Sequence, residues 1–301
     1  MRRALVHVGL PKAGSTALQR FVAANRVKLA ARGLASDPPQ IDRWSQLEFG
    51  LAACQHAGVL VPDAMLRARL GLTDLTAQAA RVAPLEAAGP ARPGLTLISS
   101  EHIAAWLTTP PLRAALDAWL GARFDRVAYL IVLRPQAAFV LSSWSESIRR
   151  GSSRPLEAFV ADFDEIDVAA TARDWAEQFG PRMHGAMLPD RPGDLERGFC
   201  RWLGIDMAGL TVPPPANPAL SAPAAELLRR ANAMLGPDIA RPAWKRAAFA
   251  ALRAPVSRAL AGAAPLALDV AQTSDLAARY PDPIPVPQGR DVLVDPSAVF
   301  G

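Results

Sequence analysis

The chain has 301 residues, half of them hydrophobic and a fifth charged, and its formal net charge is +5. This supply of apolar side chains suffices for a sizeable core and excludes an intrinsically disordered chain. Its positive charge comes almost entirely from arginines that are dispersed along the sequence, so a small anionic ligand is favoured over nucleic acid as the partner.

The first predicted elements are a strand, a turn and a helix. Residues 4–9 form a short apolar run that leads directly into a glycine-containing turn. Residues 15–32 place apolar side chains at helical spacing, and Gly33 ends that helix. Residues 35–93 predict a mostly helical insertion, which closes in a glycine- and proline-rich linker at residues 89–94.

The middle of the chain alternates strands and helices. Residues 95–99 predict a second strand and residues 110–121 a helix. Residues 127–133, VAYLIVL, are the most strand-like run, and they are continuously apolar, as expected of a parallel strand covered on both faces. Residues 136–150 follow a helical period.

The last part of the chain predicts further helices and one strand. A strand is expected at residues 183–188, and helices at residues 166–179, 193–203, 222–235 and 242–261. Residues 236–301 form a C-terminal wrap, whose last forty residues are punctuated by prolines and are expected to cross the surface. The alternation predicts one α/β domain over residues 1–301, a three-layer sandwich with a central parallel sheet.

Residues 9–16, GLPKAGST, have the length and both end glycines of a Walker A loop, GxxxxGK[ST]. Ser15 occupies the usual lysine position, and Lys12 lies three residues earlier. The backbone N–H groups of such a turn and the dipole of the following helix still favour an anion. Ser15 and Thr16 add hydroxyl donors, and Lys12 adds a mobile positive charge.

A Walker B aspartate would lie in one of the two candidate strands, residues 95–99 and 127–133, but neither strand contains an acid. The first runs into Ser99-Ser100-Glu101 and the second is followed by Arg134-Pro135. Nucleotide hydrolases of this kind need that aspartate to hold Mg²⁺. Metal-dependent phosphoryl transfer is therefore disfavoured, and no metal site is expected.

The run PKAGST, residues 11–16, resembles the 5′-phosphosulfate loop, PKxG[ST]T, of the sulfotransferase family that uses 3′-phosphoadenosine 5′-phosphosulfate (PAPS). The resemblance implies a P-loop NTPase-like fold. It also implies that Lys12, Ala13, Gly14, Ser15 and Thr16 hold the 5′-phosphosulfate. The alternative is a tight strand-to-helix turn that binds nothing.

Arg134 follows the best predicted strand, and Ser142 lies eight residues further on the next helix. Ligands of doubly wound sheets bind at the carboxyl ends of strands, and a guanidinium can grip a phosphate bidentately. Residues 127–151 resemble the family's 3′-phosphate-binding segment, which implies that Arg134 and Ser142 hold the 3′-phosphate of PAPS. The alternative is a surface salt bridge and a polar helix face.

Sulfuryl transfer needs a base for the acceptor proton and a cation for the leaving oxygen. Lys12 is the candidate cation. Glu101 and His102 both follow the strand at residues 95–99, and Glu101 is favoured because the segment resembles the branch of the family with a glutamate there. A structural role for either residue is the alternative. His7, His56 and His184 have no ligand-like spacing and are read as structural.

The expected function is sulfuryl transfer from PAPS to a hydroxyl or amine of a small-molecule or carbohydrate acceptor, with a carbohydrate or glycolipid favoured. Residues 174–180, 193–205 and 217–221 resemble later segments of bacterial members. The family's basic, glycine-containing loop near the C-terminus has no counterpart, which leaves the adenine and lid contacts unassigned. A degenerate P-loop kinase and a catalytically silent nucleotide-binding or scaffold protein are the alternatives.

The compartment is predicted from the cysteines and from hydropathy. Cys54 and Cys200 are far apart without a CxxC pair, as in proteins of a reducing compartment. No stretch approaches the roughly 20 apolar residues that cross a bilayer, and Pro11 and Lys12 interrupt the first apolar run before it could act as a signal peptide. We therefore expect a cytoplasmic protein without an integral membrane segment.

Overall fold

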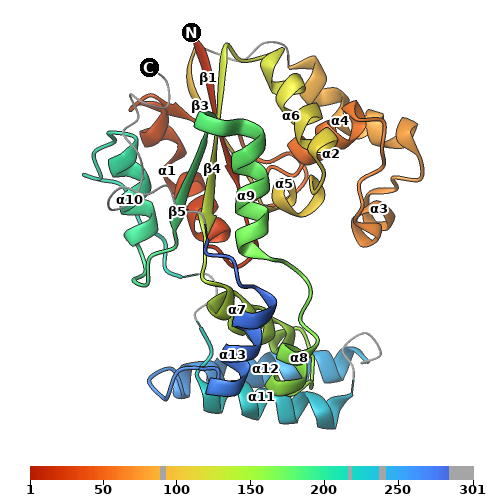
Figure 1. Cartoon of the computed structure of the whole chain (residues 1–301), viewed down its shortest axis with the longest axis vertical. Helices are drawn as coiled ribbons and strands as arrows, with labels where there is room; N and C mark the ends of the chain where they lie inside the picture. Colours follow the sequence, from red (N-terminus) through yellow and green to blue (C-terminus); the bar gives the residue numbers. More distant parts are fainter. Residues whose placement is uncertain (89–92, 216–218, 237–241, 285–301) are drawn as a thin grey trace. The chain divides into compact units, whose positions relative to one another are not determined.

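The computed structural model describes residues 1–88, 93–215, 219–236 and 242–284. The described residues divide into two compact units, one drawn from residues 1–133, 171–215 and 284 and the other from residues 134–170 and 219–283 (Figure 1). The expected single domain over residues 1–301 stays a prediction. Most of the predicted linker at residues 89–94, Asn217 and Pro218, and residues 285–301 of the C-terminal wrap lie outside the described residues.

The first unit contains a five-stranded, all-parallel sheet in the order β2-β3-β1-β4-β5. Its strands are β1 (Arg2–Val8), β2 (Leu34–Ala35), β3 (Gly94–Ser100), β4 (Arg126–Leu133) and β5 (Met183–Met187). The α/β class and the parallel sheet are thus confirmed. The sequence pattern missed β2, because two residues are too few to show an alternation.

Helices cover both faces of this sheet, as a three-layer sandwich requires. Figure 1 shows α1 and α10 on one side of the strands and α6 and α9 on the other. The helices are α1 (Ser15–Ala30), α2 (Glu48–His56), α3 (Ala64–Leu70), α4 (Leu75–Ala87), α5 (Glu101–Trp106), α6 (Pro110–Gly121), α9 (Val168–Phe179) and α10 (Asp194–Trp202). Helices α2, α3 and α4 fall in the expected insertion at residues 35–93.

Tyr129 of β4 anchors the layer that contains α6 and α9. Its ring is fully buried and stacks on Phe179 of α9 with 4.1 Å between the ring centroids. Its hydroxyl donates a hydrogen bond of 2.7 Å to Asp117 of α6. Arg113 of α6, 3% exposed, donates from Nε to Gln178 of α9 over 2.6 Å. Apolar contacts and satisfied polar groups therefore hold both helices on this face.

The strand order places a topological switch point between β1 and β4. The connection after β1 leads to β2, on one side of the sheet, and the connection after β4 leads to β5, on the other. Adjacent strands whose connections diverge leave a crevice at their carboxyl ends, where open α/β sheets bind ligands. Residues 9–14 leave β1 at this crevice, and Arg134 follows the last residue of β4.

The described part of the second unit is helical. It contains α7 (Gln136–Arg149), α8 (Leu156–Ala161), α11 (Ala222–Leu235), α12 (Ala243–Ala259), α13 (Val270–Arg279) and the first turn of α9. The tight aromatic pair Phe139 and Phe163, with ring centroids 5.9 Å apart, lies in its core. No helix of the described residues is long and apolar enough to cross a membrane.

Residues 270–279 of the expected C-terminal wrap form α13, a helix that the sequence pattern did not predict and whose one buried residue is Leu276. Asp269 and Gln272 form a capping box that starts this helix, which satisfies two N–H groups at its beginning. At its end, Arg279 Nη1 and the Tyr280 hydroxyl each donate to the Phe163 carbonyl over 2.9 Å. These bonds tie α13 to the segment after α8.

Candidate anion-binding site

The turn at residues 9–14 joins β1 to α1 and is closed by short-range hydrogen bonds. The Ala13 N–H donates to the Leu10 carbonyl over 3.3 Å. The Ser15 hydroxyl donates to the same carbonyl over 3.1 Å. At its start, the Gly9 N–H donates to the Ser100 carbonyl of β3 over 3.0 Å. The turn is therefore fixed both to itself and to the neighbouring strand.

The sequence assigned the hydroxyls of both Ser15 and Thr16 to a ligand. In the structure the Ser15 hydroxyl donates within the turn, and its role toward a ligand stays a prediction. Ser15 is buried, whereas Thr16 is half-buried. The Thr16 hydroxyl is therefore the more accessible of the two.

Two residues of the turn have left-handed backbone. Gly14 has φ 85° and Lys12 has φ 61°, and Lys12 is the one non-glycine residue with positive φ in the described ranges. For an L-residue this conformation costs about 1–2 kcal/mol. Strain of this kind persists where the surrounding structure imposes it, which happens often at ligand-binding sites.

Both glycines of the motif are also required by space. A Cβ on Gly9 would lie 2.7 Å from the Ser15 Oγ and 3.0 Å from the backbone of Glu101. A Cβ on Gly14 would lie 2.7 Å from Leu195 and 2.8 Å from Leu188. Gly9 thus lets the turn approach the start of α5, and Gly14 lets α10 and the end of β5 pack on the turn.

The N-terminus of α1 meets the conditions for binding an anion. Gly14 occupies the N-cap position, no side chain caps the helix, and its first turn contains no acid. An α-helix begins with backbone N–H groups that lack partners within the helix, and its dipole favours negative charge there. Half-buried Lys12 precedes this helix end. The residues present therefore fit a phosphate- or sulfate-like group.

Glu101 is the first residue of α5, directly after β3. Its Cα and N lie 3.0 Å from the position that a Cβ on Gly9 would occupy, so the start of α5 borders the turn. Ser100 caps α5 by accepting the N–H of His102 over 3.2 Å. The structure thus brings Glu101 and the turn together in the first unit.

His102 is held by its own neighbours. Its Nδ1 lies 3.1 Å from the Ser45 Oγ, which is also 2.9 Å from the Ser100 Oγ. Its ring centroid is 4.6 Å from that of Trp106. Burial, the largest cause, lowers the pKa of His102, so the neutral imidazole is favoured. These contacts suit a packing role, and the choice between Glu101 and His102 as base stays a prediction.

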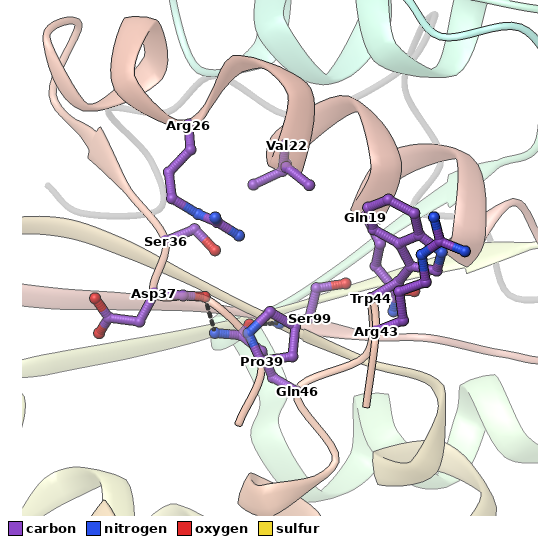
Figure 2. Close-up of a pocket in the computed structure, with 11 residues that line it drawn as sticks. Gln19, Val22, Arg26, Ser36, Asp37, Pro39, Arg43, Trp44, Gln46 and Ser99 are labelled. Carbon is purple, nitrogen blue, oxygen red and sulfur yellow. Dashed lines mark hydrogen bonds between the residues drawn. The ribbon is translucent and has the colours of Figure 1, made fainter. Parts of the chain in front are cut away.

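Sequence reasoning missed Ser45 and Gln46. The Gln46 side chain accepts from the Ser99 N–H over 2.8 Å and donates to the Asp37 carbonyl over 3.0 Å (Figure 2). The Gln46 N–H donates to the Ser99 carbonyl over 3.0 Å. The two residues lie more than fifty positions before the residues of β3 that they contact, and no local spacing signals such a contact.

Arg134 and Ser142 belong to the second unit. Arg134 directly follows β4, and Ser142 lies in the middle of α7, as the sequence predicted. Both are half-buried. Gln136 fixes the start of α7, because its side chain donates to the Ile166 carbonyl over 2.8 Å and accepts from the Val168 N–H over 3.0 Å. The role of Arg134 and Ser142 in binding a 3′-phosphate stays a prediction.

His7, His184 and both cysteines are buried. His7 is buried with its Nδ1 2.8 Å from the Ser99 Oγ, and burial lowers its pKa to about 4. His184 is buried beside Trp202, and burial lowers its pKa. Cys54 and Cys200 are free and buried. Across the described ranges, no group of three or more His, Cys, Asp or Glu side chains could hold a metal ion.

Comparison of the chain with protein-family models, with curated proteins and with solved structures found no match. The functional assignment therefore depends on the motifs and on the geometry of the turn.

Proposed function

We propose that the protein transfers a sulfuryl group from PAPS to a hydroxyl or amine of an acceptor. The observation that carries the proposal is the turn at residues 9–14, which leads into an uncapped helix and holds Lys12 in left-handed backbone at the switch point of a parallel sheet. The resemblance of residues 11–16 to the phosphosulfate loop supports PAPS over a nucleoside triphosphate, because the lysine is at position 12 and not at position 15. The P-loop NTPase-like identity of the fold is part of the same proposal.

The residues of the turn have separate roles in this proposal. The backbone N–H groups of residues 14–16 and the Thr16 hydroxyl bind the 5′-phosphosulfate. Arg134 and Ser142 bind the 3′-phosphate, which distinguishes PAPS from ATP. PAPS supplies the sulfuryl group when bound, and no metal ion takes part.

Two side chains assist the transfer. The Glu101 carboxylate accepts the proton that the acceptor hydroxyl loses as its oxygen bonds to sulfur. The Lys12 ammonium stabilises the negative charge that develops on the oxygen leaving the sulfur. The products are the sulfated acceptor and 3′-phosphoadenosine 5′-phosphate. A carbohydrate or glycolipid is the favoured acceptor.

Ligand-induced thermal stabilisation tests the choice of nucleotide. We expect 3′-phosphoadenosine 5′-phosphate to stabilise the protein by about 2.7 kcal/mol at a hundred times its Kd. Neither 5′-AMP nor ATP with Mg²⁺ should match it at equal concentration. Arg134→Ala should reduce the shift to that of 5′-AMP, since only the 3′-phosphate differs. A larger shift with ATP and Mg²⁺, accompanied by ATP turnover, would support the kinase instead.

Transfer of labelled sulfate from PAPS to a panel of hydroxylated and aminated acceptors tests the chemistry. Glu101→Gln should lower kcat about 10²–10⁴-fold and leave binding of 3′-phosphoadenosine 5′-phosphate unchanged. A full rate in this variant, with a loss in His102→Gln, would make His102 the base. Binding without transfer to any acceptor would identify a silent nucleotide-binding protein.

A further inference from the structure

Helix α12 of the second unit exposes almost its whole length. It lies beside α11 (Figure 1), and Phe249 is the one buried residue among its 17. Its sequence, AWKRAAFAALRAPVSRA, is apolar at most positions. A surface helix normally turns its apolar side chains toward the core, and a contiguous exposed apolar surface marks a site of interaction. The exposed side of α12 therefore requires a partner.

The exposed side chains of α12 form one apolar face. Trp244, Ala248, Ala251 and Pro255 follow one another at intervals of four, three and four residues, and all four are exposed. Residues at such intervals share one face of a helix. Trp244 is 66% exposed, more than any other tryptophan of the chain. Leu252, 38% exposed, borders the same face because it lies four residues after Ala248.

Positive charge accompanies this face. The basic residues of α12 are Lys245, Arg246, Arg253 and Arg258, and residues 239–268 contain no Asp or Glu. The Lys245 Nζ donates to the Leu235 carbonyl over 3.3 Å. The Arg253 Nη1 donates to the Arg149 carbonyl over 3.5 Å. A carbonyl accepts these bonds without neutralising the cations, so the charge of α12 stays available to an anionic partner.

Two guanidinium groups lie close together where α12 meets α7. Burial is the largest cause that lowers the pKa of Arg149, and the charge of Arg253 lowers that pKa further. Like charges at this range repel each other. Arg258 adds an exposed cation in the last turn of α12. A negatively charged partner would be attracted along the length of this helix.

We propose that the exposed face of α12 binds a membrane surface that contains anionic lipids. Trp244 and Leu252 enter the boundary between the lipid headgroups and the acyl chains, and the cations of α12 contact the lipid phosphates. A tryptophan suits this boundary because its ring is apolar and its N–H is polar. The helix lies on the membrane and does not cross it.

The charge of α12 favours lipid over two other partners. In a two-fold pair of α12 helices the same surface would meet itself, so cations would face cations with no acid from either helix. A nucleic acid would attract the cations, but it would leave the alanine and proline side chains of the face without an apolar environment. An anionic membrane offers both negative charge and an apolar interior.

Flotation of the whole chain with phosphatidylcholine vesicles, with and without phosphatidylserine, tests the proposal. Phosphatidylserine should tighten binding about tenfold or more, and added salt should weaken it. Arg258→Gln should weaken binding about fivefold, which is the contribution of one cation near an anionic surface. Trp244→Ala should weaken it about tenfold or more, because an apolar side chain no longer leaves water.

Two exposed residues of the first unit supply matched controls. Arg201→Gln removes the same charge from α10, and Met65→Ala shortens an apolar side chain of α3 that is 84% exposed. Both variants should bind vesicles as the wild type does. Tryptophan emission gives a second readout, because vesicle binding should shift it to the blue through Trp244. Trp244→Phe should keep the binding and lose that shift.

Each alternative partner predicts a different result. Equal binding to both kinds of vesicle, or no binding to either, would overturn the proposal, as would equal weakening by Arg201→Gln and Arg258→Gln. A dimer in sedimentation velocity that Trp244→Ala dissociates would assign the face to a second copy of the chain. Duplex DNA that binds through Arg258 in the absence of vesicle binding would assign it to nucleic acid. No nucleotide is present in these measurements, so their outcome does not depend on the proposed sulfuryl transfer.

Discussion

Lys12 combines a backbone conformation that suits glycine with a side chain that the proposed chemistry needs. Its φ of 61° is unfavourable for any residue with a Cβ. A glycine would relieve that cost but would remove the ammonium from the turn. We interpret the retained lysine as a local loss of stability that serves binding, as strained residues at functional sites often do.

Replacing Lys12 by Gly and by Ala separates the two effects. Both variants lose the same side-chain contacts, so their difference reports the left-handed backbone. We expect Lys12→Gly to be more stable than Lys12→Ala by about 1 kcal/mol, measured by urea denaturation with equal slopes. Both should fail to transfer sulfate. Equal stability of the two variants would mean that residue 12 does not keep a positive φ in solution.

The turn could be predicted from sequence because its determinants are adjacent in the chain. Strand, glycines, lysine and helix start all lie within residues 4–19, and each obeys a local rule. The Ser15 hydroxyl bonds inside the turn because of the direction in which the Leu10 carbonyl points. No sequence pattern encodes that direction. The contacts of Ser45 and of Gln46 need the fold to bring distant segments together.

At the scale of elements, length and local signals decided which helices the sequence predicted. The bounds predicted for α6, residues 110–121, and for α11, residues 222–235, are those of the structure, and both helices have a proline in their first turn. Helices α5 and α8 have six residues each, which is too short for a periodic pattern. Helix α13 did carry a signal, Asp269 followed by Gln272, but its proline-rich surroundings obscured it.

Loss of the cap of α13 should destabilise the second unit. Asp269→Ala removes the acceptor of the Gln272 N–H bond of 2.8 Å, and we expect a loss of about 1 kcal/mol. The matched control is Ser274→Ala, an exposed position of the same helix, which should stay within about 0.5 kcal/mol of the wild type. Thermal denaturation compares the three proteins. No difference between the two variants would show that α13 does not contribute to the cooperative unit.

At the scale of the whole molecule, two buried titratable groups have opposite effects on how stability changes with pH. Burial lowers the pKa of His7 from 6.5 to about 4. Burial also raises the pKa of Glu48, which is 1% exposed, from 4.5 to about 7. Its Oε1 accepts the Gln40 N–H over 3.2 Å, and its Oε2 has no partner. The folded protein therefore favours the neutral form of both groups.

The effects of the two pKa shifts on stability should nearly cancel in the wild type. Each effect should become visible in a variant that lacks the other group. Between pH 4 and 6.5 the unfolded chain binds a proton at His7 that the folded protein does not, so this group adds stability as pH rises. Between pH 4.5 and 7 only the folded protein keeps a proton at Glu48, so this group removes stability as pH rises. Each effect amounts to about 3 kcal/mol of the free energy of unfolding.

The variants should therefore differ from the wild type in opposite directions. Relative to the wild type, the free energy of unfolding of His7→Asn should fall by about 3 kcal/mol from pH 4 to 6.5, and that of Glu48→Gln should rise by about 3 kcal/mol from pH 4.5 to 7. Urea denaturation across this range measures both differences, and parallel profiles for all three proteins would show that the folded state does not keep these two groups neutral.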